Sequence, residues 1–145
     1  MDELIQEMKV SLASTFAFYL KAHNFHWNVE GPNFPQYHEF FGDLWEETFG
    51  AIDGLAEHLR TLRAFAPGSL SRYTELSIVQ DEVNIPSAMA MFQKLSSDND
   101  MLLAQLTKTQ ALAESNKKMG LANYLQDRID AHEKHGWMLR STIKG

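Results

Sequence analysis

The side chains best suited to chemistry in this sequence are histidines and carboxylates. His26 and His38 precede Asp53 and Glu57, and the two acidic residues are one helical turn apart. The 145-residue chain contains no cysteine, which excludes disulfides, thiolate nucleophiles and thiolate metal sites. A mixed set of imidazole and carboxylate donors suits iron or manganese. His26, His38, Asp53 and Glu57 are therefore candidate metal ligands.

Three of these residues fall on one predicted helix, on the same face. His38 and Asp53 are separated by roughly 22 Å along the helix axis, so a single chain cannot bring them to one metal ion. Either they are unrelated surface groups, or two copies of the helix run antiparallel about a two-fold axis. In the second case His38 meets the partner subunit's Asp53 and Glu57. His26 would join His38 from the same chain, because a Gly-Pro turn lies between them.

Four long segments with helical periodicity must position these side chains. They cover residues 2–27, 35–65, 87–114 and 119–144, and residues 67–86 leave room for a short extra helix. Short loops make antiparallel neighbours, and the long crossover lets the third helix lie parallel to the second. This order predicts an all-α fold, the ferritin-like four-helix bundle, as a single domain over residues 1–145.

Apolar stripes indicate which side of each segment packs inward. In the first segment the stripe recurs every fourth residue, at Leu4, Met8, Leu12, Phe16 and Leu20. The second segment carries a broader stripe, formed by Phe41, Trp45, Phe49, Ile52, Leu55 and Leu59. Ser87 follows a proline and is expected to cap the third helix.

The composition limits the partners of the protein. Nineteen acidic residues outnumber thirteen Lys and Arg, which gives a net charge of −6 with neutral His. This balance favours attraction of cations over binding of nucleic acid. No apolar run approaches the roughly 20 residues needed to cross a bilayer, and the first residues lack the features of a signal peptide. A cytoplasmic protein without membrane contact is expected.

Three blocks of the sequence resemble the Dps family of mini-ferritins. Residues 21–34 contain His-Trp-Asn-Val-x-Gly-x-x-Phe, and His38 follows at the family's spacing. Residues 53–57 are similar to the family's Asp-x-x-Ala-Glu, and residues 128–140 of the last helix also resemble it. The blocks occur in order and at consistent spacing, so the resemblance covers essentially the whole chain.

The resemblance implies both an assembly and an activity. Dps proteins form hollow dodecamers and oxidise Fe(II) at their two-fold dimer interfaces, preferentially with hydrogen peroxide. They store the product as a ferric mineral, and this removal of free Fe(II) limits oxidative damage. By this pattern His26 and His38 of one subunit bind iron together with Asp53 and Glu57 of the partner subunit. The implied protein is a ferroxidase and iron store, with a di-iron or mono-iron centre in each interface.

The chain departs from the family at one ligand position. Where the family usually has Asp, four residues after the second His, this sequence has Gly42. Asp43 points about 100° away on a helix, and Glu46 shares the metal-facing side one turn further along. A weaker second iron position, completed by water, and reduced ferroxidase activity are expected. The alternative function is a Dps-like cage that sequesters metal with an incomplete, weakly active centre.

Two further features narrow the function. DNA-binding members commonly carry a tail rich in Lys and Arg, but here the predicted helices reach almost to both ends, so DNA binding by a basic tail is not expected. A ferritin-like di-iron enzyme acting on an organic substrate is a third interpretation. The Glu-x-x-His pair of such enzymes is not found in the last helix, because Glu133 and His135 are only two residues apart.

Overall fold

The computed structural model describes residues 1–144. They form five helices: α1 (Asp2–Asn28), α2 (Phe34–Thr61), α3 (Leu70–Leu76), α4 (Ala88–Ser115) and α5 (Met119–Ile143). Residues 1–144 contain no strand, so the predicted all-α class and the short extra helix are confirmed. Within the same residues, no helix combines the length and apolar character that a membrane crossing requires.

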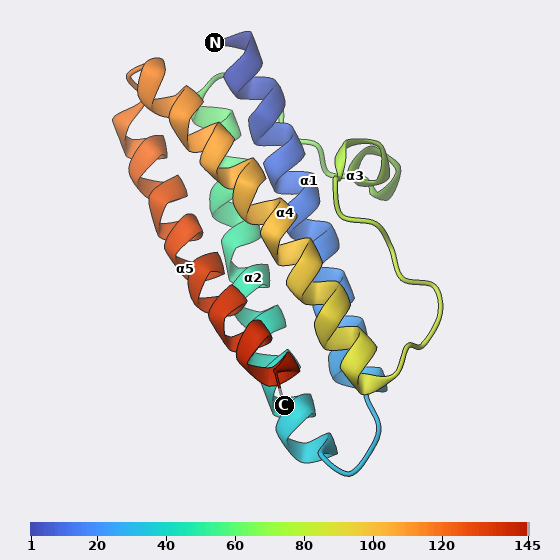
Figure 1. Cartoon of the computed structure of the whole chain (residues 1–145). Helices are drawn as coiled ribbons and strands as arrows, with labels where there is room; N and C mark the ends of the chain where they lie inside the picture. The colour runs from blue at the N-terminus through green and yellow to red at the C-terminus, as the bar shows by residue number, and fades with distance from the viewer. Residues whose placement is uncertain (145) are drawn as a thin grey trace.

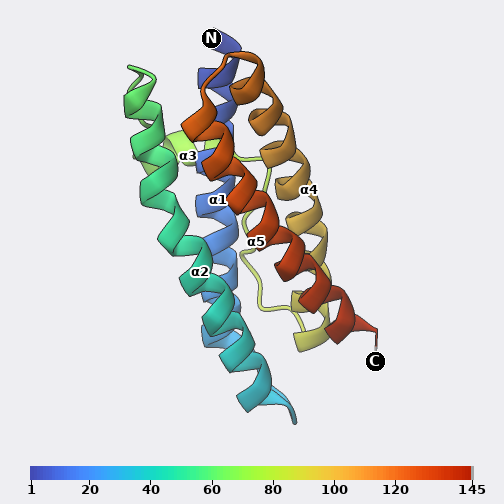
Figure 2. The ribbon, with the colours of Figure 1, turned by 90° about the vertical axis from the view of Figure 1, so that its left-hand side faces the viewer.

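The four long helices form a bundle with one long crossover (Figures 1 and 2). α1 and α2 are antiparallel, as are α4 and α5, and the crossover makes α4 parallel to α2 (Figure 1). α3 lies within the crossover and packs against α1. α1 contacts both α2 and α4 broadly, whereas α2 and α5 make much less contact with each other. The predicted connectivity is confirmed.

Local signals place the ends of several helices. Asp2 and Glu3 lie in the first turn of α1, where negative charge is favourable. Ser87 caps α4 as predicted, because its Oγ accepts a hydrogen bond of 3.2 Å from the backbone N–H of Ala90. Gly31 adopts a φ of +126° in the turn between α1 and α2, a conformation that favours glycine. This turn sets the last residues of α1 beside the first turn of α2.

The second helix ends earlier than predicted. The apolar pattern continues to Phe65, but α2 ends at Thr61. Arg63 has a left-handed φ of 66°, and the N–H of Ala64 bonds back to the carbonyl of Leu59 at 3.1 Å. Such a turn satisfies carbonyl groups that a helix end leaves free. Phe65 therefore lies beyond the helix and is 81% exposed.

The apolar stripe of α1 is correct only in its first half. Its buried members are Leu4, Met8 and Leu12. Phe16 is half-buried and Leu20 is 39% exposed, contrary to prediction. A four-residue spacing overshoots the 3.6-residue turn by about 40° at each step, so it leaves the inward face after a few turns. The core face then passes to Thr15, Phe18, Ala22 and Phe25.

The stripe of α2 shows the same drift. Phe41, Leu55 and Leu59 are fully buried, but Phe49 is 51% exposed. The ring of Phe49 packs at 4.9 Å from the ring of Tyr19 on α1. Phe49 therefore borders the bundle core rather than filling it.

Candidate metal centre

The structure brings His26 and His38 together at one end of the bundle. His26 lies in the last turn of α1, and His38 is the fifth residue of α2. Their rings stack with centroids 3.9 Å apart and planes 14° apart. The short α1–α2 turn causes this contact, which the sequence predicted from the turn between the two residues.

Reciprocal hydrogen bonds fix the orientation of both rings. Nδ1 of His26 lies 2.7 Å from the carbonyl oxygen of His38, and Nδ1 of His38 lies 2.7 Å from the carbonyl oxygen of His26. A carbonyl oxygen only accepts, so each Nδ1 carries the hydrogen and donates. In the neutral ring, Nε2 then keeps its lone pair for a cation. Metal-binding histidines use this same arrangement, in which the second ring nitrogen donates to a carbonyl.

Two neighbours support this histidine pair. Phe34 stacks on His38 with centroids 5.0 Å apart. Gly42 lies against His26, since a Cβ atom at this glycine would be 3.0 Å from Cε1 of the imidazole. The missing side chain at Gly42 thus leaves room for the ring.

Asp53 and Glu57 lie apart from the histidines in the single chain. Both are exposed on α2, one turn from each other and more than three turns beyond His38. Within residues 1–144 no group of three or more His, Asp or Glu side chains is placed to hold a metal ion. The chain therefore presents a pair of imidazoles and a pair of carboxylates at two separate positions of one helix.

An aromatic cluster adjoins the histidine pair and was not predicted from the sequence. The ring of His23 lies between Trp27 and Trp45, with a centroid distance of 3.9 Å to each. The hydroxyl of Tyr19 and Nδ1 of His23 are 3.1 Å apart. Burial, and then the nearby charge of His26, lower the pKa of His23. The spacing of Tyr19, His23 and Trp27 at successive helical turns was the available signal.

A polar network joins α2 to α5 and was also missed. Oε2 of Glu47 lies 2.5 Å from Arg128, and Oε1 lies 2.7 Å from Nε2 of His135. Behind them, Nδ1 of His132 lies 2.8 Å from Oδ1 of Asn99. Burial would raise the pKa of Glu47, but hydrogen bonds from His135 and Arg128 hold that pKa well below its usual range. Burial, followed by the charge of Arg128, lowers the pKa of His132 strongly, so this ring is neutral.

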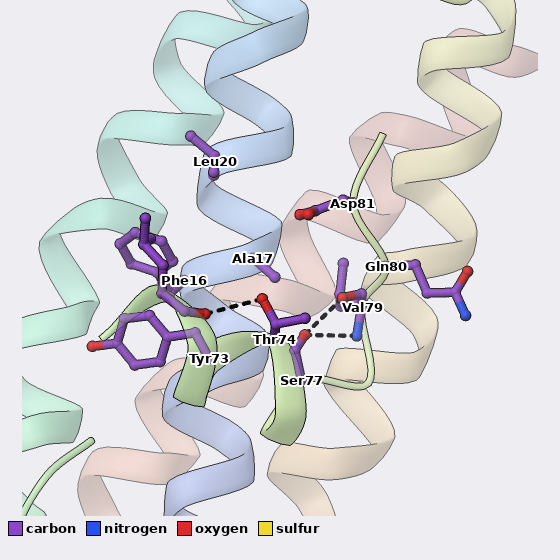
Figure 3. Close-up of a pocket in the computed structure, with 10 residues that line it drawn as sticks. Phe16, Ala17, Leu20, Tyr73, Thr74, Ser77, Val79, Gln80 and Asp81 are labelled. Carbon is purple, nitrogen blue, oxygen red and sulfur yellow. Dashed lines mark hydrogen bonds between the residues drawn. The ribbon is translucent and has the colours of Figure 1, made fainter. Parts of the chain in front are cut away.

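A cavity of about 570 Å³ lies elsewhere, between α1 and the crossover that carries α3 (Figure 3). Apolar and polar side chains line it: Phe16, Ala17, Leu20, Leu70, Tyr73, Thr74, Ser77, Val79, Gln80 and Asp81. Its lining includes none of the four candidate ligands. The cavity and the histidine pair are therefore separate features.

Comparison with known proteins places this arrangement in a family. The ferritin-like domain matches residues 5–145. The DNA protection during starvation protein of Brevibacillus brevis is 34% identical over 134 residues, covering 92% of this chain and 89% of that protein. The chain belongs to the Dps mini-ferritins, a group within the ferritin-like family.

Solved structures agree with that assignment. The crystal structure of Dps from Staphylococcus aureus superposes with a TM-score of 0.94 at 29% identity, covering 99% of this chain and 96% of that one. Dps from Vibrio cholerae, described as a member of a broad superfamily of ferritin-like diiron-carboxylate proteins, gives a TM-score of 0.93 at 27% identity over 98% of this chain and 89% of that one. The ferritin-like fold predicted from the sequence is confirmed.

Proposed function

We propose that this protein oxidises Fe(II) with hydrogen peroxide and stores the ferric product inside a dodecameric cage. Each oxidation site is shared between two subunits, with His26 and His38 from one and Asp53 and Glu57 from the partner subunit. The observation that carries the proposal is the histidine pair, whose two Nδ1 atoms are engaged and whose two Nε2 atoms are left for a cation. Membership of the Dps group supports iron as that cation.

The placement of the carboxylates supports a shared site. Asp53 and Glu57 are exposed on the same helix that carries His38. If two copies of α2 run antiparallel about a two-fold axis, the histidine end of one faces the carboxylate segment of the other, and two equivalent sites form. This arrangement supplies two imidazole nitrogens and two carboxylate groups, a donor set that suits iron.

The chemistry at such a site balances with peroxide as oxidant. Two Fe(II) ions each give one electron to hydrogen peroxide, its O–O bond breaks, and two hydroxide ions form. The carboxylates of Asp53 and Glu57 offset the higher charge of Fe(III), while the Nδ1 hydrogen bonds to the carbonyl oxygens orient the two imidazoles so that Nε2 of each can bind the ion. The ferric product then hydrolyses and enters the mineral.

The test is anaerobic loading with Fe(II), followed by a stoichiometric addition of hydrogen peroxide. The wild type is expected to form ferric product rapidly, and a His38→Ala, Glu57→Ala double variant to form it much more slowly. Glu39→Ala, which removes an exposed carboxylate of α2, serves as the control. Equal rates in wild type and double variant would disprove the site. A stable monomer in solution would disprove the shared arrangement.

Gly42 supports a second candidate function. The family usually places Asp there, so one carboxylate is missing from the set that this subunit offers. In this alternative the cage sequesters metal with little oxidation. Retention of Fe(II) without growth of the ferric signal after peroxide addition would favour sequestration over ferroxidase activity.

A further inference from the structure

Tyr124 of α5 contacts the part of α2 that carries the two carboxylates. Its hydroxyl donates a hydrogen bond of 3.0 Å to the backbone carbonyl of Ala51. The end of the ring fills the place of a side chain at Gly54, because a Cβ atom there would lie 2.7 Å from Cζ of Tyr124. The same ring packs against the ring of His58, with centroids 4.8 Å apart. Tyr124 therefore contacts α2 at three positions within about two helical turns.

The link between α2 and α5 depends on a small number of side chains. The two helices run antiparallel (Figure 2), and they make little contact with each other, whereas α2 packs broadly on α1. Glu47, one turn before Ala51 on α2, is hydrogen-bonded to Arg128. Arg128 in turn lies one turn after Tyr124 on α5. Successive turns of α2 are thus tied to successive turns of α5, first through Glu47 and then through Tyr124.

The contact with Tyr124 restrains the rotation of α2 about its own axis. Asp53 and Glu57 each directly precede a residue that contacts Tyr124, so they lie about 100° around the helix from those contacts. The surface of a helix lies about 5–6 Å from its axis, so a rotation of about 10° moves a group there by about 1 Å. Metal–ligand distances tolerate only about 0.2 Å. A small loss of restraint at Tyr124 is therefore enough to disturb both carboxylates as ligands.

We propose that Tyr124 is a positioning residue that sets the direction of Asp53 and Glu57. Its contacts with Ala51 and Gly54 act through the backbone of α2, and Tyr124 is not itself a ligand. The inference rests on the proposed shared site, in which these carboxylates meet the histidine pair of the partner subunit. It adds a residue of α5 to a site whose proposed ligands all lie on α1 and α2.

The test titrates the assembled protein with Co²⁺ and follows visible absorption, without iron or peroxide, so that the readout is independent of oxidation. The spectrum of Co²⁺ reports the type and geometry of its ligands. Tyr124→Phe removes the hydrogen bond to Ala51, and Gly54→Ala forces the ring out of its place on α2. Both variants are expected to change the spectrum and to raise the Co²⁺ Kd about tenfold, the lower end of the effect of groups that support metal ligands.

Each variant has a matched control. Tyr73→Phe removes a tyrosine hydroxyl from α3, outside the contact between α2 and α5. Gly50→Ala adds a methyl group to α2 that would meet nothing within 4 Å. Both controls are expected to keep the wild-type Co²⁺ Kd and spectrum.

Two results separate failure of this inference from failure of the proposed site. If an Asp53→Ala, Glu57→Ala variant binds Co²⁺ as the wild type does, the shared site itself is wrong. If that variant loses a Co²⁺ site but Tyr124→Phe binds Co²⁺ as Tyr73→Phe does, only the positioning role is overturned. A merely structural contact would give this second result, because it would lower the Tm and leave the Co²⁺ Kd of the folded assembly unchanged. Circular dichroism and size-exclusion chromatography on every variant establish that folded assemblies of equal size are compared.

Discussion

Replacing Glu47 with Gln tests the polar link between α2 and α5. The carboxylate of Glu47 makes bonds of 2.5 and 3.0 Å to Arg128 and one of 2.7 Å to His135. Glutamine keeps the size of the side chain but removes its charge, so the Arg128 guanidinium, whose side chain is 8% exposed, loses its counter-ion. Breaking a buried ion pair costs about 3–5 kcal/mol. Because the Glu47 side chain is 38% exposed and partly solvated, we expect a loss of about 2–3 kcal/mol.

The effect of Glu47→Gln should depend on pH in a defined direction. The pKa of Glu47 is lower in the folded protein than in the unfolded chain. The stabilisation by Glu47 is therefore complete above the unfolded pKa of about 4.3 and is lost as the pH falls below it. The neutral His132 destabilises the fold below its unfolded pKa of about 6.5 in both proteins, and the charge of Glu47 raises the pKa of His132 in the wild type only. The difference between wild type and variant therefore reports the charge of Glu47, including its effect on His132.

The assay is urea-induced unfolding, monitored through the fluorescence of the tryptophan residues. Chain concentration is held constant, because the stability of an oligomer depends on it. Glu39→Gln, an exposed carboxylate on the same helix, is the control and is expected to change stability by less than about 0.5 kcal/mol. A Glu47→Gln variant as stable as this control at neutral pH would refute the reasoning. So would a difference from wild type that grows as the pH is lowered.

Two other substitutions test local features of the helices. Gly54→Ala should destabilise the protein by about 1–3 kcal/mol, measured as a lower Tm, because the added methyl group would collide with the hydroxyl of Tyr124. Gly50→Ala is the control: its methyl group would meet nothing within 4 Å, so this variant should be as stable as the wild type or more stable. Equal effects of the two glycine variants would contradict this. Ser87→Ala should lower the free energy of unfolding by about 1 kcal/mol, because the helix loses the hydrogen bond from the N–H of Ala90 to the cap. Ser87→Asp should recover most of this loss. A Ser87→Ala variant with the same free energy of unfolding as the wild type would show that the cap is unimportant.

The sequence alone determined much of the fold, because the signals are local. Helical periodicity, the Ser87 cap and the turn signals around Gly31 depend on residues close together in the chain, so the bundle and its connectivity could be predicted. The adjacency of His26 and His38 followed in the same way, since only a short turn separates their helices. The association of this pair with Asp53 and Glu57 stays a prediction.

Only the tertiary structure decided which side chains meet across the bundle. The inward face of α1 passes from Leu12 to Phe18 because the neighbouring helices, and not a four-residue repeat, define the core. The hydrogen bond from Arg128 to Glu47 joins residues 81 positions apart. Whether these two side chains meet depends on the rotation and the axial position of α5 relative to α2. The seating of His26 against Gly42 depends likewise on the closeness of two helix backbones. Spacing along a chain specifies a helix face, but the packing of helices sets the distances between faces.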